Sequence, residues 1–293
     1  MKKFALLLVL VVLGLQSCKK QELDETTPQQ LRPEVTMDQL IKAHDLEHAH
    51  NSLCDADLPW KSGFIGKEAV QYQVTPAGTI LLEGDIVVPA DMITEQPATE
   101  ERSASKAGVY LWPQAKVYYS FVSGYPTNLR NAFLTACQVW NYYTGVQFIQ
   151  RTNQANYIRV FKDGNSNYSN LGFLGGMQNL SLADSNPGVA IHELAHALGL
   201  IHEHQRSDRN SSIWVNPALA STANFARYTN SYNYSAFDWN SIMLYGSSPY
   251  GTSWTMLTLP SYVPFVNSIE YWRANGTYAL PSNNDIAAIN YLY

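Results

Sequence analysis

The chain has 293 residues, of which 46% are hydrophobic and 15% are charged, so its composition supports at least one full hydrophobic core and is not that of a disordered protein. Its formal net charge of -5 argues against nucleic-acid binding, because that function begins with clustered lysine and arginine side chains. Three cysteines, at positions 18, 54 and 137, are too few and too scattered for a disulfide scaffold, so the fold must depend mainly on packing.

The N-terminus has the pattern of an export signal. Lys2 and Lys3 precede an apolar run of 12 residues, Phe4–Leu15, which is too short to cross a bilayer but typical of a signal-peptide core. Residues 1–17 are therefore predicted to be a signal peptide and are excluded from the fold. The end of this segment, before Cys18, resembles the lipobox of bacterial lipoproteins, in which the cysteine is lipidated and becomes the new N-terminus. The alternative is an ordinary cleaved signal with an incidental cysteine.

Residues 18–102 form an acidic leader broken by prolines, since the first 102 residues carry 16 acidic and nine basic side chains. A helix is predicted within Val35–Asn51, and Thr79–Val88 predicts a strand, a turn and a second strand. Thr94–Lys106 has few apolar residues and predicts an exposed linker that proteases can reach. We place the end of the leader at Arg102.

The body of the chain, residues 103–293, has clear elements. Val117–Val122 predicts a strand, and the apolar residues of Leu129–Trp140 recur at helical spacing. Cys137 lies on the apolar face of that helix, so we interpret it as a buried small hydrophobe rather than a catalytic thiol. A capping-box pattern, Ser282–Asp285, predicts the start of a final helix.

The chemistry is concentrated in Val189–Asp208. The run His192-Glu193-Leu194-Ala195-His196 is the two-histidine pattern of a zinc-binding helix, in which positions i and i+4 share one face and both imidazoles can reach one metal ion. Asn186 can cap this helix, and Gly199 suits a left-handed stop after which the chain reverses and delivers His202.

Three neutral imidazoles leave one position open on four-coordinate zinc, which is the arrangement of a catalytic site rather than a structural one. Glu193 is then the candidate general base, which would take a proton from the attacking water and pass it to the leaving amine of a peptide bond. His204 falls outside the spacing of the ligands, and we interpret it as a surface residue or as a support for a ligand. The histidines of the leader, at positions 44, 48 and 50, are assigned to a solvated face.

The extended string His192-Glu193-x-x-His196-x-x-Gly199-x-x-His202-Glu203-x-x-Arg206-x-Asp208-Arg209 resembles the signature of the astacin metalloendopeptidases, a branch of the metzincins. Three further segments carry the resemblance. Ser241–Tyr245 is similar to the Met-turn of the family, Leu111–Pro113 to the start of its mature enzyme, and Asp285–Tyr293 to its closing helix. The resemblance therefore covers the whole body, residues 103–293.

The resemblance implies a role for each matching residue. The zinc ligands would be His192, His196 and His202, with Glu193 as the base. Tyr245 would be a further, displaceable zinc ligand that swings away to stabilise the oxyanion. Met243 would form an apolar floor beneath the metal, and Glu203 would meet the new amino terminus after activation. An edge strand would align an extended substrate through its backbone; it would comprise Gly176, Met177, Gln178 and Asn179.

The leader carries a second mark of the family. Glu83-Gly84-Asp85-Ile86 resembles the aspartate switch of astacin propeptides, in which the carboxylate, here that of Asp85, takes the position on zinc that water needs. Taken alone, Gly-Asp would predict only a hairpin turn. Cys54 is a rival blocker, since thiolate is a good zinc ligand.

The family spacing also places the start of the mature enzyme at Ser103, after cleavage at Arg102 by a trypsin-like protease. If Cys18 is lipidated, that cleavage would release the enzyme from a membrane anchor. The family usually has paired cysteines in the catalytic domain, but only Cys137 follows Arg102. The body must therefore hold its shape without those disulfides.

The predicted fold is α+β, a metzincin zinc-protease fold with an N-terminal lobe of twisted sheet and two helices and an irregular C-terminal lobe that ends in a helix. The predicted function is that of an exported, secreted or lipid-anchored zinc metalloendopeptidase, made as a zymogen, that acts on protein or peptide substrates. Two alternatives stay open: a catalytically silent adhesion or binding lipoprotein on a protease scaffold, and another metzincin branch. Because the family often prefers acidic residues after the scissile bond, Arg273, the only Lys or Arg after the Met-turn, is a candidate for the substrate pocket.

Overall fold

The computed structural model describes residues 59–65, 68–74, 78–82, 84–88, 90, 93–96, 110–222, 224–228 and 231–293. The predicted signal peptide, Cys18, the helix expected within Val35–Asn51, Cys54 and the cleavage site at Arg102 and Ser103 lie outside these residues. Within the described part of the chain, no helix is both long enough and apolar enough to cross a membrane.

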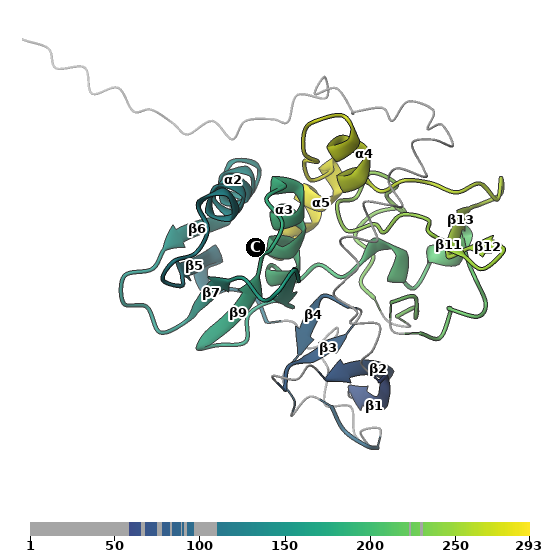
Figure 1. The fold of residues 1–293 in the computed structure, drawn as a ribbon, viewed down its shortest axis with the longest axis horizontal. Helices are drawn as coiled ribbons and strands as arrows, with labels where there is room; N and C mark the ends of the chain where they lie inside the picture. Colours follow the sequence, from purple (N-terminus) through teal and green to yellow (C-terminus); the bar gives the residue numbers. More distant parts are fainter. Residues whose placement is uncertain are drawn as a thin grey trace, which may run out of the picture. The chain divides into compact units, whose positions relative to one another are not determined.

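A nine-stranded sheet joins the body to the described part of the leader, in the order β1-β2-β3-β4-β8-β9-β7-β5-β6 (Figure 1). The leader supplies β1 (Lys61–Ile65), β2 (Glu68–Val74), β3 (Ile80–Leu82) and β4 (Ile86–Val88). The body supplies β5 (Lys116–Phe121), which follows the short helix η3 (Pro113–Ala115), and then β6 (Gln147–Gln150), β7 (Tyr157–Phe161), β8 (Tyr168–Asn170) and β9 (Met177–Ser181). Strands β6, β5, β7 and β9 are mutually parallel, whereas β8 is antiparallel to β9.

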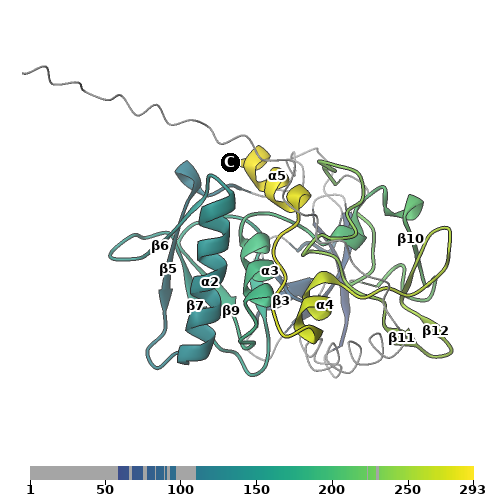
Figure 2. The same cartoon turned by 90° about the horizontal axis from the view of Figure 1, so that it is seen from above.

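Two helices lie side by side against the body's part of the sheet (Figure 2). The first, α2 (Thr127–Tyr143), buries the apolar face that the sequence predicts, including Cys137. The second, α3 (Pro187–Ala197), is buried along nearly its whole length. The Trp140 indole donates to the Ile191 carbonyl oxygen at 3.1 Å, so its one polar group is satisfied inside the core. The sheet and two helices predicted for the N-terminal lobe are thus confirmed.

The described part of the leader extends this sheet and brings a small core of its own. Strands β3 and β4 form an antiparallel hairpin, and β4 pairs in parallel with β8, with Ile86 opposite Ser169. The side-chain amide of Asn170 also donates to the Val87 carbonyl oxygen at 3.1 Å. The strand, turn and strand predicted within Thr79–Val88 are therefore confirmed. The buried members of the leader's cluster are Ile80, Leu82, Ile86 and Val88.

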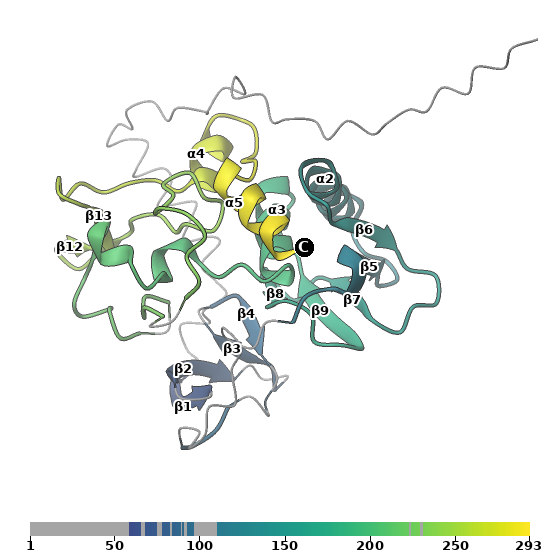
Figure 3. The same cartoon turned by 180° about the vertical axis from the view of Figure 1, so that it is seen from behind.

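Beyond Leu198 the chain is less regular, as predicted (Figure 3). It contains the short helices η4 (Glu203–Gln205) and η5 (Arg209–Ser211), the strand pair β10 (Ile213–Val215) and β13 (Met256–Thr258), and the strand pair β11 (Pro249–Tyr250) and β12 (Ser253–Trp254). Two helices follow, α4 (Ser268–Ala274) and α5 (Asn283–Leu292). The buried residues of this lobe gather around Ile213, Leu244, Met256 and Phe265.

One buried carboxylate starts α5 and also anchors the Met-turn segment. The capping box is present: the Ser282 hydroxyl accepts from the Asp285 backbone N–H at 3.0 Å, and Asp285 accepts from the Ser282 N–H at 2.9 Å. Asp285 also accepts from the Ser241 hydroxyl at 2.7 Å and the Ile242 N–H at 2.9 Å. Burial, with the charge of Asp238 nearby, raises the pKa of Asp285 to about 6. The final helix and the floor of the site therefore depend on the same side chain.

We expect Asp285→Ala to lower the free energy of unfolding by about 2 to 3 kcal/mol, because it removes a cap and leaves buried donors unsatisfied. Asp285→Asn should cost less than half as much, since its amide oxygen still accepts hydrogen bonds and no charge is buried. Urea unfolding of both variants at pH 8, followed by circular dichroism, measures the difference. Equal losses for the two variants would contradict the assigned hydrogen bonds.

Candidate active site and metal centre

The local sequence of α3 determines where its histidines point. The Asn186 side chain accepts from the Gly188 N–H at 2.7 Å, which caps the helix as predicted. His192 and His196, one turn apart, then face the same side. Gly199 follows with φ of +106°, a conformation that a side chain would strain, and the chain turns back to deliver His202.

Three imidazoles and one carboxylate from distant parts of the sequence meet at one buried point. Each of His192, His196, His202 and Asp85 offers one ligand atom, and these four atoms lie within 4.8 Å of one another. The Nε2 atoms of His196 and His202 are 3.2 Å apart. Asp85 Oδ2 lies 3.1 Å from His202 Nε2 and 3.5 Å from His192 Nε2, and Asp85 Oδ1 lies 3.7 Å from His196 Nε2.

Each imidazole is oriented by a hydrogen bond from its other nitrogen, Nδ1. The acceptors for His192, His196 and His202 are, in that order, the carbonyl oxygens of Ile242 and Leu200 and the side-chain oxygen of Gln205, at 2.8, 2.7 and 3.0 Å. An acceptor at Nδ1 assigns the proton to that atom, so the neutral ring turns the lone pair of Nε2 toward the centre. Lone pairs 3.2 Å apart repel unless a cation lies between them. The donor set therefore fits zinc, which binds neutral imidazole nitrogen and carboxylate oxygen.

Asp85 is both a turn residue and the fourth member of the cluster. It lies in the loop between β3 and β4, after Gly84 with φ of +88°. The interpretation as a hairpin turn is therefore compatible with a place at the metal site. Its backbone carbonyl accepts from the Ser169 N–H at 3.0 Å, and its Oδ2 accepts from the Tyr245 hydroxyl at 2.8 Å. Burial raises the pKa of the Asp85 carboxyl, but when His202 is protonated its charge and the hydrogen bonds from the imidazoles hold that pKa well below its usual range.

Glu193 lies beside the cluster on α3 and is 2% exposed. Its Oε2 has no hydrogen-bond partner among the described residues. Burial, and then the charge of Asp85, raise the pKa of Glu193 well above its usual value. Burial also lowers the pKa of His196 to about 4. A buried carboxylate with an unbonded oxygen next to a metal site has the placement that a general base needs.

The segment that resembles the Met-turn, Ser241–Tyr245, is hydrogen-bonded to one of the histidines. Met243 is 2% exposed and belongs to the main core cluster, and its carbonyl oxygen accepts from the Glu203 N–H at 3.0 Å. The preceding residue, Ile242, holds the His192 ring through its carbonyl oxygen. This segment is therefore tied to two of the residues that the sequence assigns to the site.

Glu203 is half-buried next to His202 and is paired with two groups of the C-terminal lobe. Its Oε1 accepts from the Arg206 guanidinium at 2.8 Å and from the Asp238 N–H at 2.7 Å. Burial raises the pKa of Glu203 to about 7, although Arg206 lowers it. Its predicted contact with a new amino terminus involves residues outside the described part of the chain and stays a prediction.

The structure agrees only in part with the edge position predicted for Gly176–Asn179. Strand β9 lies between β7 and β8, so it is an inner strand of the sheet, and β8 is the edge of the body's own sheet. The pairing of β9 with β8 begins only at Leu180, however, so the predicted segment pairs along β7 alone. Pairing partners are set by the tertiary fold, which the local sequence pattern does not reveal. Gln178 is buried and its side chain donates to the Gly172 carbonyl oxygen at 2.8 Å, whereas Met177 is 49% exposed. Contact of these residues with substrate stays a prediction.

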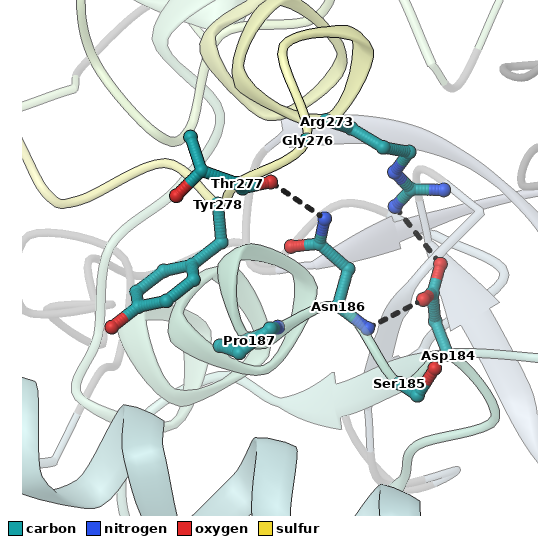
Figure 4. A pocket seen from close by; sticks show the side chains of 8 residues that line it. All are labelled: Asp184, Ser185, Asn186, Pro187, Arg273, Gly276, Thr277 and Tyr278. Carbon is teal, nitrogen blue, oxygen red and sulfur yellow. Dashed lines mark hydrogen bonds and ion pairs between the residues drawn. The ribbon is translucent and has the colours of Figure 1, made fainter.

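Arg273 lies in a polar pocket at the N-terminal end of α3 (Figure 4). Its guanidinium donates to Asp184 at 2.9 Å and its Nε lies 3.8 Å from Glu270. The charge that would attract an acidic substrate residue is thus already paired. The cavity has a volume of about 430 Å³. Its lining residues are Asp184, Ser185, Asn186, Pro187, Arg273, Gly276, Thr277 and Tyr278.

Two residues at the site escaped the sequence pattern. Gln205 is 1% exposed and orients His202, and no motif assigned it a role. His204 is fully buried, so its interpretation as a surface residue is wrong, and its alternative interpretation as a support for a ligand stays a prediction. Its ring lies 4.4 Å from that of Tyr245, between ring centroids, at an interplanar angle of 27°. One local signal was available: both residues lie within three positions of the ligand His202, in the short helix η4, which keeps them close to it.

The histidine site on a helix beneath a mixed sheet is that of a metzincin-type zinc protease, and comparison with known proteins gives the family. The model of the Astacin peptidase family matches residues 104–293. The chain therefore belongs to the astacin family, whose members are zinc peptidases.

Relatives share this body. Astacin-like metalloprotease toxin 1 from Loxosceles intermedia is 34% identical over 180 residues, covering 57% of this chain and 66% of the toxin. Flavastacin from Elizabethkingia meningoseptica is 28% identical over 311 residues, covering 100% of this chain and 64% of flavastacin. The chain thus spans slightly under two thirds of the length of both. The solved structure of high choriolytic enzyme 1 from Oryzias latipes, a hatching enzyme zinc-protease, is similar with a TM-score of 0.54 and 30% identity, covering 67% of this chain and 98% of that one.

We expect Gln205→Ala to weaken zinc binding by about 10- to 100-fold, because it removes the acceptor that orients His202. Gln205→Glu retains an acceptor at the same position and should bind zinc within a few-fold of the wild type. Competition with a chelating indicator measures both affinities on the trimmed protein. An unchanged affinity in Gln205→Ala would show that the His202 ring is held by other contacts.

Proposed function

We propose that this protein is an exported zinc metalloendopeptidase, made as a latent zymogen, that hydrolyses peptide bonds with Glu193 as general base. The observation that carries the proposal is the convergence of three inward-facing histidines with Asp85 of the leader, beside a buried Glu193. A protein that only held a metal would need the histidines, but it would not need a buried carboxylate with an unbonded oxygen next to them. That carboxylate favours an enzyme over a silent binding module.

The residues of the site divide the reaction between them. Zinc, held by His192, His196 and His202, would supply a Lewis acid that polarises the substrate carbonyl and acidifies water. Glu193 takes a proton from the attacking water and passes it to the leaving nitrogen, so that the amide C–N bond breaks after the C–O bond has formed. Tyr245 donates a hydrogen bond to the developing oxyanion once Asp85 has left.

Latency follows from the position of the leader. The Asp85 carboxylate lies where the attacking water would have to be, and the pairing of β4 with β8 keeps the Asp85 backbone in place. Cleavage by a trypsin-like protease between Arg102 and Ser103 would release it. The composition of the linker supports this site, and so does the start of the family match at residue 104.

The proposed location is outside the cytoplasm. The pattern of residues 1–17 supports export, and Cys18 is the proposed lipidation site that would tether the zymogen to a membrane. The relatives named as a hatching enzyme and a toxin support an extracellular site of action. The proposed substrates are proteins or peptides bound in extended form, for which the edge of β8 becomes free when the leader departs.

We expect residues 18–293 with Cys18→Ser to cleave casein only after limited trypsin treatment, and to lose the activity to a zinc chelator. Glu193→Gln should lower the activity of the trimmed protein by at least about 100-fold, since a general base contributes that much, while one zinc ion still binds. Zinc content by atomic absorption is the control for the variant. Trimmed, zinc-loaded wild-type protein that cleaves neither casein nor a peptide library would move the assignment to a binding module.

We expect Asp85→Ala to raise the activity of the untrimmed chain by at least about tenfold over the untrimmed wild type, because removing the carboxylate frees a site on zinc. A tenfold change means that the latent state loses about 1.4 kcal/mol of its stability relative to the active one. Cys54→Ser is the matched variant, and it should stay as latent as the wild type. Relief of latency by Cys54→Ser but not by Asp85→Ala would make the thiolate the blocking group.

A further inference from the structure

His204 is a fully buried histidine that is not part of the metal cluster. Its ring centroid lies 4.4 Å from that of Tyr245, with 27° between the ring planes, and 5.2 Å from that of His202, with 28° between them. Tyr245 in turn lies 4.4 Å from His202. The three rings therefore form a triangle in which the Tyr245 phenol contacts one zinc ligand and one imidazole that binds no metal.

The Tyr245 hydroxyl is already directed at the metal site. It donates to Asp85 Oδ2 at 2.8 Å, and that oxygen is 3.1 Å from His202 Nε2. When Asp85 leaves, this hydrogen bond is lost. The contacts of the Tyr245 ring with His202 and His204 remain, because they lie within the body of the chain, and so does its packing against the core cluster of the C-terminal lobe. Among these contacts, the two imidazoles are the flat rings that face the phenol.

His204 is itself held from outside the metal site. Its Nε2 donates to the Asn224 carbonyl oxygen at 2.8 Å, its own carbonyl oxygen accepts from Arg209 at 2.7 Å, and its ring contacts Phe225 at 5.9 Å between centroids. These partners belong to η5 and to the loop that precedes the Met-turn. The His204 ring is thus held by the C-terminal lobe as well as by its contact with His202.

If His204 only filled space, an apolar side chain would do so at a lower cost in free energy. The Nδ1 atom of His204 is buried and has no partner among the described residues, and a buried polar atom without a partner costs free energy. A flat ring that stacks on a phenol makes a directional contact, which favours one orientation of the phenol. An aliphatic side chain makes no such directional contact.

We propose that His204 is a positioning residue that holds the Tyr245 phenol beside the metal after the leader has left. The proposal rests on the function proposed above, in which Tyr245 acts on the oxyanion. His204 neither binds zinc nor touches the reacting atoms. Its effect on the reaction passes entirely through the orientation of Tyr245.

The test compares His204→Leu, which removes the flat ring, with His204→Phe, which retains it, in the trimmed protein. His204→Leu should lower kcat by about tenfold with KM within about twofold, because the stacking contact raises by a factor of that order the share of molecules whose phenol lies next to the metal site, from where it can reach the oxyanion. His204→Phe should stay within about threefold of the wild type, on the same scale. Phe237→Leu, which removes a ring contact with Trp239 elsewhere in the C-terminal lobe, is the matched control and should leave kcat within about twofold.

A second measurement separates this role from a structural one and from the proposed function. With Cu²⁺ in place of zinc, a tyrosinate-to-copper absorption band reports whether Tyr245 lies at the metal. The band should be present in the wild type and in His204→Phe and should weaken at least about threefold in His204→Leu, with metal content unchanged. If the band follows this order while the zinc form cleaves nothing, the positioning role stands and the proposed function fails.

In a Tyr245→Phe background, His204→Leu should cause no further loss of kcat, since the effect needs the phenol hydroxyl. An equal loss in both backgrounds would overturn the proposal, and so would a His204→Leu variant with wild-type kcat and band. A wild-type copper form without the band would overturn it as well, because Tyr245 would then not lie at the metal.

Discussion

The convergence of three imidazole lone pairs on one point is the constraint on which the rest of the structure depends. Without a cation, nitrogen atoms 3.2 Å apart repel each other, so the surrounding fold has to hold the rings against that repulsion. It does so with one acceptor for each Nδ1. These acceptors come from the Met-turn segment, from the turn after α3 and from η4. The ligand geometry is therefore distributed over both lobes, although two of the three ligands lie on one helix.

The described part of the leader reaches the histidine cluster as part of the folded sheet. Its last strand continues the sheet of the body through β8, and the turn before that strand carries the carboxylate. The Asp85 backbone bonds to Ser169 while its side chain reaches the histidines. Because the strand pairing fixes the turn, the carboxylate loses little further conformational freedom when it enters the site. A short acidic side chain after a glycine is then enough to occupy it.

Local rules in the sequence predicted what depends on local geometry. The caps of α3 and α5, the stop at Gly199 and the i, i+4 pair of histidines each follow from a few neighbouring residues, and all are present. The strands on either side of Gly176–Asn179 could not be predicted, because the neighbours of a strand are chosen by long-range pairing. Gln205 was missed, and His204 was left between two interpretations, for a related reason: their roles come from a ring or a nitrogen that the turn after α3 brings close, and neither side chain has a motif of its own.

The absence of cysteine pairs in the body raises the question of what secures the C-terminal end of α3, where His196 lies. The last carbonyl oxygens of a helix have no partner within it and need one from elsewhere. Here the Trp112 indole donates to Ala197 at 2.9 Å, the Tyr293 hydroxyl donates to Leu198 at 3.2 Å, and the Gly172 N–H donates to His196 at 2.9 Å. Trp112 and Tyr293 stand near the two ends of the body, and the Trp112 N–H also bonds to the Tyr293 hydroxyl. Trp112 and Tyr293 are thus fastened to the metal-binding helix and to each other by buried and partly buried hydrogen bonds. Because both residues follow the proposed cleavage site at Ser103, the mature protein would keep these bonds after the leader has left.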